Sequence, residues 1–349
     1  MNVFKLCTFV GIPLILTGCG GGGGSATVPQ YDYTLGTPSS ITDARTAFTS
    51  STAMGVPYTA PNNTTYSSLS AAHNTLNSGS DAIATVDTGA ATAWASGWTG
   101  KGVKVGVVDT FVNNSRVDDH GDWVSLVVDS VAPESNIGTI NATTLSAAAS
   151  AWDTFESNGY HIINNSWVYS KSNSDWETLV RAMVNAYDPN TPSTAEGLYI
   201  FSSGNDAQTC GSVRAEDCNF FAAITDRIRD NGYTDTGSRT IFVGAIQDGS
   251  DTITSYSIQA GDLKYDFIVA HDDVLASGDA AGTSFSAPRV AGAAALVKQK
   301  FPNLTSAQIK QVLLQTATDI GAPGVDEVYG YGKLNIAGSL SPQGTVTPR

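Results

Sequence analysis

The chain has 349 residues, of which 41% are hydrophobic and only 14% are charged, against about 25% charged in an average soluble domain. Its length fits one large domain or two small ones, and its apolar residues suffice to bury a core, which excludes wholesale disorder. Eighteen Lys and Arg against 32 Asp and Glu give a formal net charge of −14. This charge argues against a surface that neutralises phosphates, so we expect no nucleic acid among the partners.

Residues 1–18 are predicted to form a signal peptide. Lys5 precedes an apolar stretch over residues 6–16, which is too short to cross a bilayer core of about 30 Å as a permanent helix. The stretch ends in Leu16-Thr17-Gly18-Cys19. This pattern resembles the lipobox of bacterial lipoproteins, and the resemblance implies that Cys19 becomes the lipid-bearing N-terminus. The alternative is an ordinary signal peptide with an incidental Cys.

The residue after the predicted lipidation site bears on localisation. In the lipoprotein pattern of two-membrane bacteria, a residue other than Asp after the Cys implies forwarding to the outer membrane, and Gly20 follows Cys19. We therefore expect an exported protein that is anchored to the bacterial outer membrane through its N-terminal lipid, on the periplasmic face or the cell surface.

Residues 19–87 are predicted to be a tether or N-terminal arm. The glycine run over residues 20–24 has no strand before it and no helix after it, which argues against a phosphate loop and favours a flexible tether. Over residues 26–87, Ser, Thr, Ala, Asn and Pro dominate and apolar residues are isolated, which favours a loosely ordered arm; a small prodomain is the alternative. We expect the folded domain to cover residues 88–340 and residues 341–349 to form a C-terminal tail.

Short apolar runs bounded by Gly and polar residues predict buried strands in the folded domain. These runs are residues 103–108, 137–140, 161–164, 198–202, 240–245 and 267–270. Helix-like segments separate most of them, which is typical of an α/β fold with a mainly parallel central sheet and helices on both faces. Two late helices are clear: residues 284–300, and a helix that opens with a capping-box pattern at Thr305 and runs to about Thr318.

Two polar residues stand where such a sheet places ligand sites, beyond the carboxyl ends of its strands. Asp109 follows the first strand directly, and His120 opens the next apolar segment eleven residues later. A His at a helix start feels the positive end of the helix dipole, which favours the neutral ring that a general base needs. The alternatives are an Asp that forms a turn and a His that caps a backbone group.

A serine and an asparagine complete this set of candidates. Ser284 follows Gly282-Thr283 at the first turn of a predicted Ala-rich helix, so its hydroxyl lies beside backbone N–H groups that have no helical partner and can face an oxyanion. Asn205 ends another strand, and its amide can supply a second donor, worth about 10²–10³ in turnover. The alternative is an Asn that tolerates a left-handed turn.

In the order Asp109, His120, Asn205 and Ser284, the chain resembles the subtilisin-like serine peptidases, the subtilase family. The matching stretches fall within residues 88–338 and are 107–110, 120–121 with 131–133, 162–166, 203–205, 282–288 and 330–335. The Ser284 segment is most similar to the peptidase domains of Gram-negative autotransporters, although we expect no β-barrel to follow it. The resemblance implies a subtilisin-like three-layer sandwich.

The resemblance also implies a role for each residue. Ser284 is the nucleophile, His120 is its general base and then acid, and Asp109 orients the imidazole. The Asn205 side chain and the Ser284 amide are the oxyanion donors. Ser166, Ser203 and Gly204 line the groove in which an extended peptide binds. The implied reaction is hydrolysis of polypeptide substrates through an acyl-enzyme, with no cofactor and no metal.

Three features depart from the usual pattern of that family. Only ten residues separate Asp109 from His120, and Asp122-Trp123 stands where Thr and a second His are usual. Trp167 and Val168 follow Ser166 where a small residue and Gly are common. The altered surroundings of His120 favour one rival, a catalytically inactive relative that binds peptides or partner proteins. A second rival, a serine esterase, is disfavoured because Ser284 does not lie in a Gly-x-Ser-x-Gly motif.

The remaining Cys and His residues allow two further expectations. Cys210 and Cys218 lie just past Asn205, and in an oxidising compartment we expect them to form a disulfide worth about 2.5 kcal/mol; two free thiols are the alternative. His271 with the neighbouring acids is an alternative metal site, although acidic loops of this kind are commonly just solvated.

Overall fold

The computed structural model describes residues 58–59, 65–66, 89–111, 120–167, 197–208, 212–219, 221–222, 225, 239–247, 250–272 and 281–342. The predicted signal peptide, Cys19, nearly all of the predicted arm and most of the predicted tail lie outside the described residues, as do Val168 and Cys210. The predicted domain boundaries therefore stay predictions.

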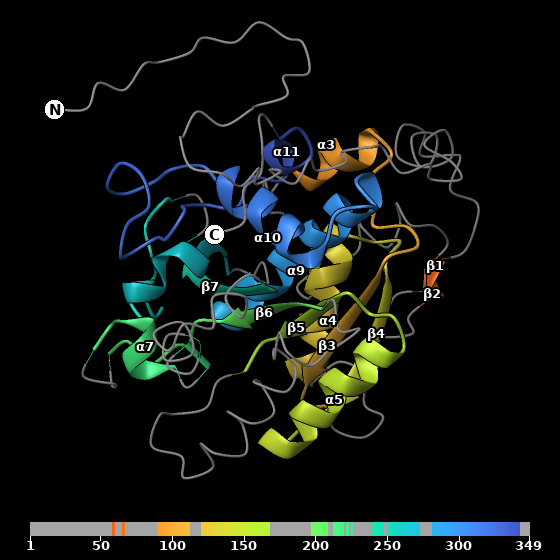
Figure 1. Ribbon diagram of the computed structural model, residues 1–349, viewed down its shortest axis with the longest axis horizontal. Helices are drawn as coiled ribbons and strands as arrows, with labels where there is room; N and C mark the ends of the chain where they lie inside the picture. Colours follow the sequence, from red (N-terminus) through yellow and green to blue (C-terminus); the bar gives the residue numbers. More distant parts are fainter. Residues whose placement is uncertain are drawn as a thin grey trace, which may run out of the picture.

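A six-stranded parallel sheet forms the centre of the fold (Figure 1). Its strand order is β4-β3-β5-β6-β7-β8. All six predicted strands are confirmed, each within one residue of the expected bounds: β3 Lys104–Asp109, β4 Asn136–Asn141, β5 Ile162–Asn165, β6 Leu198–Ser202, β7 Thr240–Ile246 and β8 Phe267–His271. A separate antiparallel pair, β1 Tyr58–Thr59 and β2 Thr65–Tyr66, lies within the predicted arm.

The position of each strand in the sheet explains its sequence. β5, β6 and β7 are buried at every residue, and strands covered on both faces read as unbroken apolar runs. β4 forms one edge of the sheet, and its residues are exposed or half-buried. The apolar runs in the sequence therefore mark the inner strands most clearly.

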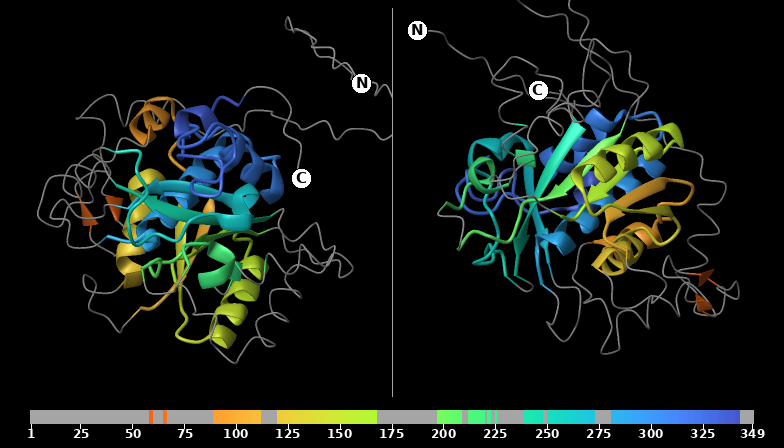
Figure 2. Two further views of the ribbon diagram at one scale, coloured as in Figure 1. Left: turned by 90° about the vertical axis from the view of Figure 1, so that its left-hand side faces the viewer. Right: turned by 90° about the horizontal axis from the view of Figure 1, so that it is seen from below.

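Helices cover both faces of the sheet (Figure 2). On one face α4 and α9 pack against the strands, with α3, α10 and α11 in the same hydrophobic cluster. On the other face α5 packs against β3 and β4, and α7 and η2 complete a second cluster. The helices are α3 Ala90–Ala95, α4 His120–Val131, α5 Leu145–Ser157, α7 Ala215–Cys218, α9 Thr283–Lys300, α10 Ser306–Gln315 and α11 Ile336–Ser339, with the 3₁₀ helix η2 Gly261–Asp266.

α9 is the central helix of the first face. It contacts β5, β6, β7, β8 and α4, and nearly every one of its residues is buried. A helix that is buried all round has no polar face, and small residues let its neighbours approach closely. A Cβ added to Gly292 would lie 2.6 Å from the Cβ of Val131 in α4. The run of Ala and Gly in this helix therefore lets it pack closely against both the sheet and the neighbouring helix α4.

α10 begins where its capping box predicts and ends earlier than expected. The Thr305 side chain accepts from the Gln308 amide, and the Gln308 side chain accepts from the Thr305 amide. The helix ends at Gln315 rather than near Thr318, because Thr318 forms main-chain hydrogen bonds in both directions with Lys333. A tertiary contact thus shortens the helix that the sequence pattern favours.

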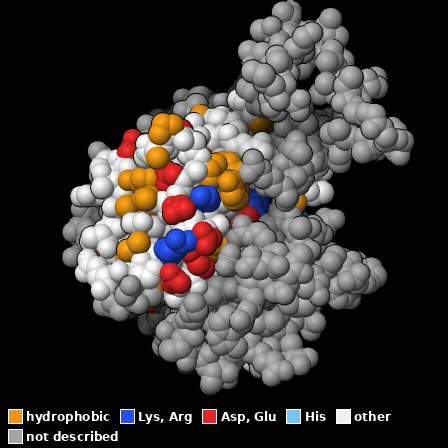
Figure 3. All heavy atoms as spheres, turned by 60° about the vertical axis from the view of Figure 1, so that its left-hand side comes forward, with side chains coloured by type: hydrophobic (Ala, Val, Ile, Leu, Met, Phe, Trp, Pro, Cys, Tyr) orange, Lys and Arg blue, Asp and Glu red, His pale blue; other side chains and the backbone are white. Residues whose placement is uncertain are grey.

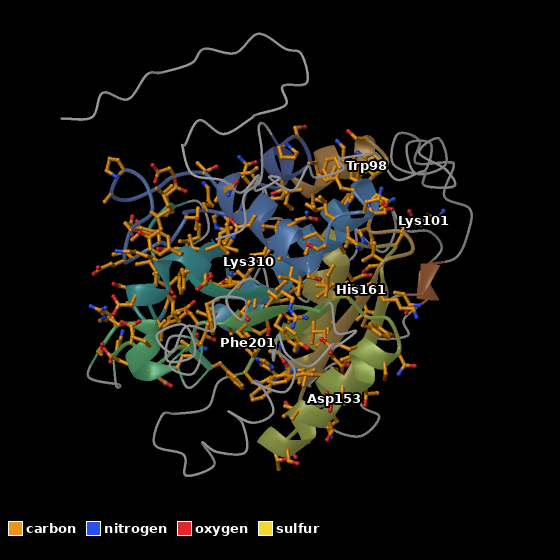
Figure 4. All side chains as sticks on the ribbon, in the orientation of Figure 1. Trp98, Lys101, Asp153, His161, Phe201 and Lys310 are labelled. Atoms are coloured by element: carbon orange, nitrogen blue, oxygen red, sulfur yellow. The ribbon has the colours of Figure 1, made fainter. Side chains whose placement is uncertain are left out.

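A buried ion pair ties α10 to the end of η2. Lys310, labelled in Figure 4, lies 2.5 Å from Asp266, and the two side chains are only 1% and 9% exposed. On the face shown in Figure 3, Lys and Arg side chains lie next to Asp and Glu side chains. Among the described residues, no helix has the length and apolar character needed to cross a membrane.

Candidate active site

Polar residues from three neighbouring strands meet at the carboxyl ends of these strands. Asp109 ends β3, Ser166 follows β5, and the segment 203–205 follows β6, and these strands are adjacent and parallel. Their carboxyl ends therefore lie together, as expected for a ligand site in an open parallel sheet. The N-terminus of α9 reaches these carboxyl ends, since the Ser284 hydroxyl contacts Ser166.

Asp109 and His120 form a close pair. Oδ1 of Asp109 lies 2.7 Å from Nδ1 of His120, and it also accepts from the Thr110 main-chain N–H at 2.7 Å. Asp109 is only 1% exposed, and its Oδ2 has no hydrogen-bond partner among the described residues. A carboxylate in this position fixes the ring with Nδ1 protonated and leaves Nε2 as the acceptor.

The pKa of His120 departs from the expectation based on the helix start. Burial lowers the pKa of His120, while the hydrogen bond and the charge of Asp109 raise it, so that the pKa ends above the ordinary value of 6.5. The sequence argument considered only the dipole of α4, which disfavours a charged imidazole. In the structure the hydrogen bond and the charge of Asp109 together outweigh burial, and the sequence argument did not include this carboxylate.

The surroundings of His120 come from two further elements. The ring centroids of His120 and Phe285 are 5.6 Å apart, which places His120 beside the residue that directly follows Ser284. A Cβ added to Gly121 would lie 2.6 Å from the Phe111 ring, so a larger residue does not fit there. The His120 side chain is 38% exposed. One part of the ring thus faces solvent, where a substrate can approach.

Ser284 lies in the first turn of α9 and is 9% exposed. Its hydroxyl donates to the Ser166 carbonyl at 2.9 Å, and the Ser166 hydroxyl donates to the Ser284 carbonyl at 2.7 Å. The second bond is possible because Pro288, four residues further on, has no N–H to donate to the Ser284 carbonyl. In this structure the Ser284 hydroxyl therefore donates to Ser166 rather than to His120.

Asn205 is held so that its amide nitrogen is free to face the site. Its Oδ1 accepts from the Thr283 main-chain N–H at 3.0 Å and from the Thr283 hydroxyl at 2.9 Å. Because both donors point at the oxygen, Nδ2 lies on the other side of the amide. A Cβ on Gly282 would lie 3.1 Å from that nitrogen. The sequence analysis named Thr283 only as part of the motif around Ser284. Its position directly before Ser284 was the one feature of the sequence that could have indicated its role.

Ser203 and Gly204, which the sequence analysis expects to line the substrate groove, make several hydrogen bonds within the protein. Ser203 is fully buried, and its hydroxyl donates to the Ile258 carbonyl at 2.9 Å. The Gly204 amide donates to the Thr283 hydroxyl, and its carbonyl accepts from Ile258. These hydrogen bonds tie both residues to the segment that carries Asn205, and their role in lining the substrate groove stays a prediction. Sequence position alone does not show which groups of a loop are already bonded.

The other sequence candidates lie at the margins of the site. Asn164, to which the sequence analysis assigned no role, donates from its side chain to the Ser166 hydroxyl at 2.9 Å and so orients it. Trp167 is half-buried and donates from its indole to the Val108 carbonyl at 2.9 Å. Among the described residues, no group of three His, Cys, Asp or Glu side chains is arranged to hold a metal, and His271 is no exception.

Several curated proteins are similar in sequence. Serotype-specific antigen 1 of Mannheimia haemolytica is 28% identical over 205 residues, which are 54% of this chain and 20% of that protein. The neisserial autotransporter lipoprotein NalP of Neisseria meningitidis serogroup B is 49% identical over 61 residues, 18% of this chain and 6% of NalP. Alkaline elastase YaB of a Bacillus species is 28% identical over 267 residues, 66% of this chain and 63% of the elastase. The chain spans less than two thirds of the length of each of these relatives.

Solved structures show the same architecture, and a family model matches the region that carries most of the site. MycP1 with its N-terminal propeptide removed has a TM-score of 0.53 at 21% identity, over 72% of this chain and 94% of that chain. The prenylagaramide maturation protease PagA has a TM-score of 0.53 at 20% identity, over 72% and 97%. The fold is therefore the α/β fold of subtilisin-like proteases. The model described as the subtilase family matches residues 120–332, which is more than half of the chain, and the protein belongs to the subtilase family.

Proposed function

We propose that the protein is an exported, membrane-anchored serine endopeptidase that cleaves polypeptides with Ser284, His120 and Asp109. The observation that carries the proposal is the 2.7 Å pair of Asp109 Oδ1 and His120 Nδ1 at the carboxyl ends of the strands, where α9 presents Ser284. The three residues follow one another in the order that the subtilase resemblance implies, and the contact of the His120 ring with Phe285, the neighbour of Ser284, supports bringing His120 and Ser284 together. Membership of the subtilase family supports this reading.

The first half of the reaction acylates the serine. His120 Nε2 takes the proton of the Ser284 hydroxyl while the oxygen bonds to the scissile carbonyl carbon. Asn205 Nδ2 and the Ser284 main-chain N–H donate to the oxyanion that forms. Asp109 stabilises the positively charged imidazole. The C–N bond then breaks as His120 gives its proton to the leaving amine, which leaves an acyl-enzyme.

The second half restores the enzyme. Water attacks the acyl carbon as His120 takes a proton from it, and the ester bond to Ser284 breaks as His120 returns that proton to the serine oxygen. The new peptide acid departs. An extended substrate is expected to pair with the Ser166 carbonyl once the Ser284 hydroxyl turns toward His120, since that carbonyl is at the site and can accept from a peptide N–H.

One observation favours a second candidate function, an inactive relative that binds peptides. The Ser284 hydroxyl donates to Ser166 and not to the imidazole, so the last link of the proton relay is absent in the resting arrangement. Hydrogen bonds of this kind are often long or misaligned before substrate binds and tighten in the complex, which is why we favour the enzyme.

Fluorophosphonate labelling and cleavage of an unfolded protein separate the two candidates. Wild-type protein should be labelled and should cleave, and Ser284→Ala should do neither. Ser286→Ala is the matched control, because Ser286 is a fully buried serine two residues further along α9, and it should behave as wild type. Labelling of Ser284→Ala contradicts the assigned nucleophile. Binding without cleavage by both wild type and Ser284→Ala supports the inactive relative.

The membrane anchor and the disulfide belong to the same proposal. We propose that Cys19 carries lipid and holds the protein at the outer membrane; NalP, a similar protein, is itself a lipoprotein. We also propose that Cys218 pairs with Cys210, which follows Asn205 closely in the sequence, and the assignment of Cys218 as a disulfide cysteine supports this pairing. Mass spectrometry of the exported protein, intact and after proteolysis with and without reduction, measures both modifications. An unlipidated N-terminus other than Cys19 contradicts the anchor.

A further inference from the structure

We propose that Asn219 is a positioning residue for the oxyanion site: its side chain holds the peptide from which Asn205 projects. This inference rests on the proposed function, in which Asn205 donates to the oxyanion. Asn219 directly follows α7 and is only 1% exposed. It acts through the main chain of the strand end and does not itself face the substrate.

The segment that carries Asn205 leaves the sheet immediately before it. The Ser203 amide still bonds to Val243 in β7 at 2.9 Å, but no ladder continues beyond it. Gly204 follows with φ +115°. Gly adopts this conformation readily because it has no Cβ, and for the same reason no side chain of its own fixes the backbone there. Thr283 holds the Asn205 amide oxygen directly, and the position of the Asn205 main chain depends on what holds the peptide between Ser203 and Gly204.

Side chains hold this peptide at both ends. Asn219 Nδ2 donates to the Ser203 carbonyl at 2.9 Å and also to the Ser202 carbonyl at 3.0 Å. At the other end of the same peptide, the Gly204 amide donates to the Thr283 hydroxyl at 3.1 Å. The orientation of the peptide is thus fixed by Asn219 on one side and by the neighbour of Ser284 on the other.

Asn219 is itself held by the turn after α7. Its Oδ1 accepts from the Phe221 amide at 2.9 Å and from the Ala222 amide at 3.3 Å. Both donor hydrogens and both acceptor positions of this amide are therefore in use, which is the full capacity of an Asn side chain. A buried side chain that makes all of its hydrogen bonds is held in one orientation. A shift of a group on one side of it therefore moves the groups bonded on the other side. Asn219 connects the turn after α7 to the oxyanion donor in this way.

Replacing the donating nitrogen tests this role. Asn219→Asp keeps an acceptor for Phe221 and Ala222 but turns a carboxylate oxygen toward the two carbonyls, which repel it. A misplacement of about 1 Å in an active site costs up to about 10²-fold in rate. We therefore expect kcat to fall by about 10-fold to 10²-fold with KM within about threefold, because only the transition state carries the oxyanion.

Gln299→Glu is the matched control. Gln299 is a buried amide, 7% exposed, whose oxygen accepts from the Thr99 and Gly100 amides and whose nitrogen donates to the Gly97 carbonyl. It lies fifteen residues from Ser284 along α9, about 22 Å at 1.5 Å per residue. This control makes the same chemical change at a main-chain brace remote from the site, and it should leave kcat unchanged.

The experiment measures kcat and KM of the full chain for wild type, Asn219→Asp, Asn205→Ala, the double variant and Gln299→Glu. If Asn219 acts through Asn205, the double variant is no slower than Asn205→Ala alone. An equal further loss in the double variant, an unchanged kcat in Asn219→Asp, or the same loss in Gln299→Glu overturns the proposal. Should Asn219→Asp not fold, Asn219→Ser leaves room for a water donor and should show a smaller loss that again vanishes with Asn205→Ala.

A second readout needs no turnover. The side-chain Nδ2 resonances of Asn205, identified by their absence in Asn205→Ala, should shift in the ¹⁵N spectrum of Asn219→Asp more than in that of Gln299→Glu. Equal shifts overturn the positioning role. If wild-type protein hydrolyses nothing, the proposed function fails and this spectrum alone decides the role of Asn219, so the two failures are distinguishable.

Discussion

Asp109→Asn is the sharpest perturbation of the proposed proton relay, because it removes a charge and preserves the shape. In the native structure three donors point at Oδ1: the His120 ring, the Thr110 amide and, at 3.4 Å, the Thr110 hydroxyl. The introduced amide oxygen should therefore take the place of Oδ1, since an amide nitrogen cannot accept from them. Its nitrogen then replaces Oδ2, which has no partner among the described residues. The ring keeps its tautomer and loses only the charge beside it.

The size of the effect follows from that geometry. Opposite charges about 4 Å apart attract by about 4 kcal/mol at an effective dielectric constant of about 20. The His120 side chain is 38% exposed, so screening by solvent reduces this value. We expect kcat to fall by about 10²-fold to 10³-fold, at about 1.4 kcal/mol per factor of ten. The two unpaired buried N–H groups should also lower the unfolding free energy, by about 1–3 kcal/mol for each.

The pH dependence gives the second part of this prediction. Burial lowers the pKa of His120, and Asp109 raises it by a larger total, so the wild-type acid limb of kcat/KM should have its midpoint above pH 6.5. Asp109→Asn removes the raising causes and leaves burial, so that limb should move to lower pH. Because the folded-state pKa is raised, the pair stabilises the fold fully below pH 6.5, and this contribution is lost as pH rises through the folded-state pKa.

The assay is kcat/KM for a fluorogenic peptide across pH 5–9, with the His120 ring titrated by NMR in both proteins and unfolding by urea at pH 5 and pH 8. An acid limb that stays in place, or that moves to higher pH, refutes the assignment of Asp109 as the dominant influence on His120. A loss above about 10⁴-fold contradicts the inferred amide orientation, since it is the size expected when the wrong tautomer forms.

Two further predictions concern stability, measured by urea unfolding. Gly106→Ala places a Cβ 2.7 Å from the Phe155 ring and should cost about 1–3 kcal/mol through overpacking; an unchanged midpoint would show that α5 moves freely against β3. Lys310→Met breaks the buried pair with Asp266 and should cost about 3–5 kcal/mol, whereas adding Asp266→Leu should recover much of that loss, because a buried charge that has lost its ion-pair partner is worse than an apolar pair. A double variant as unstable as Lys310→Met argues that packing, and not charge, holds α10 in place.

Local signals in the sequence were sufficient for the strands and for the start of α10. Buried strands read as apolar runs, and a capping box depends on residues three apart, so neither needs knowledge of the rest of the chain. The end of α10 was misjudged, because the bonds between Thr318 and Lys333 that turn the chain are tertiary. The sequence argument for a neutral His120 also left out the Asp109 carboxylate, because the contact of that carboxylate with the ring is made only in the folded chain.

The sequence by itself determined the parallel sheet, the buried central helix and the order of the four site residues. These features depend on hydrophobic periodicity, on the positions of Gly and Pro and on short motifs, all of which involve residues close together in the chain. Pro288 also indicates in the sequence that the Ser284 carbonyl, in the first turn of α9, has no N–H four residues later to bond with. Only the tertiary structure decided that the Ser166 hydroxyl fills that opening and that Asn219 holds the peptide before Asn205. Hydrogen bonds between distant segments depend on the strand order and on how each helix packs on the sheet, and no spacing within one segment encodes them.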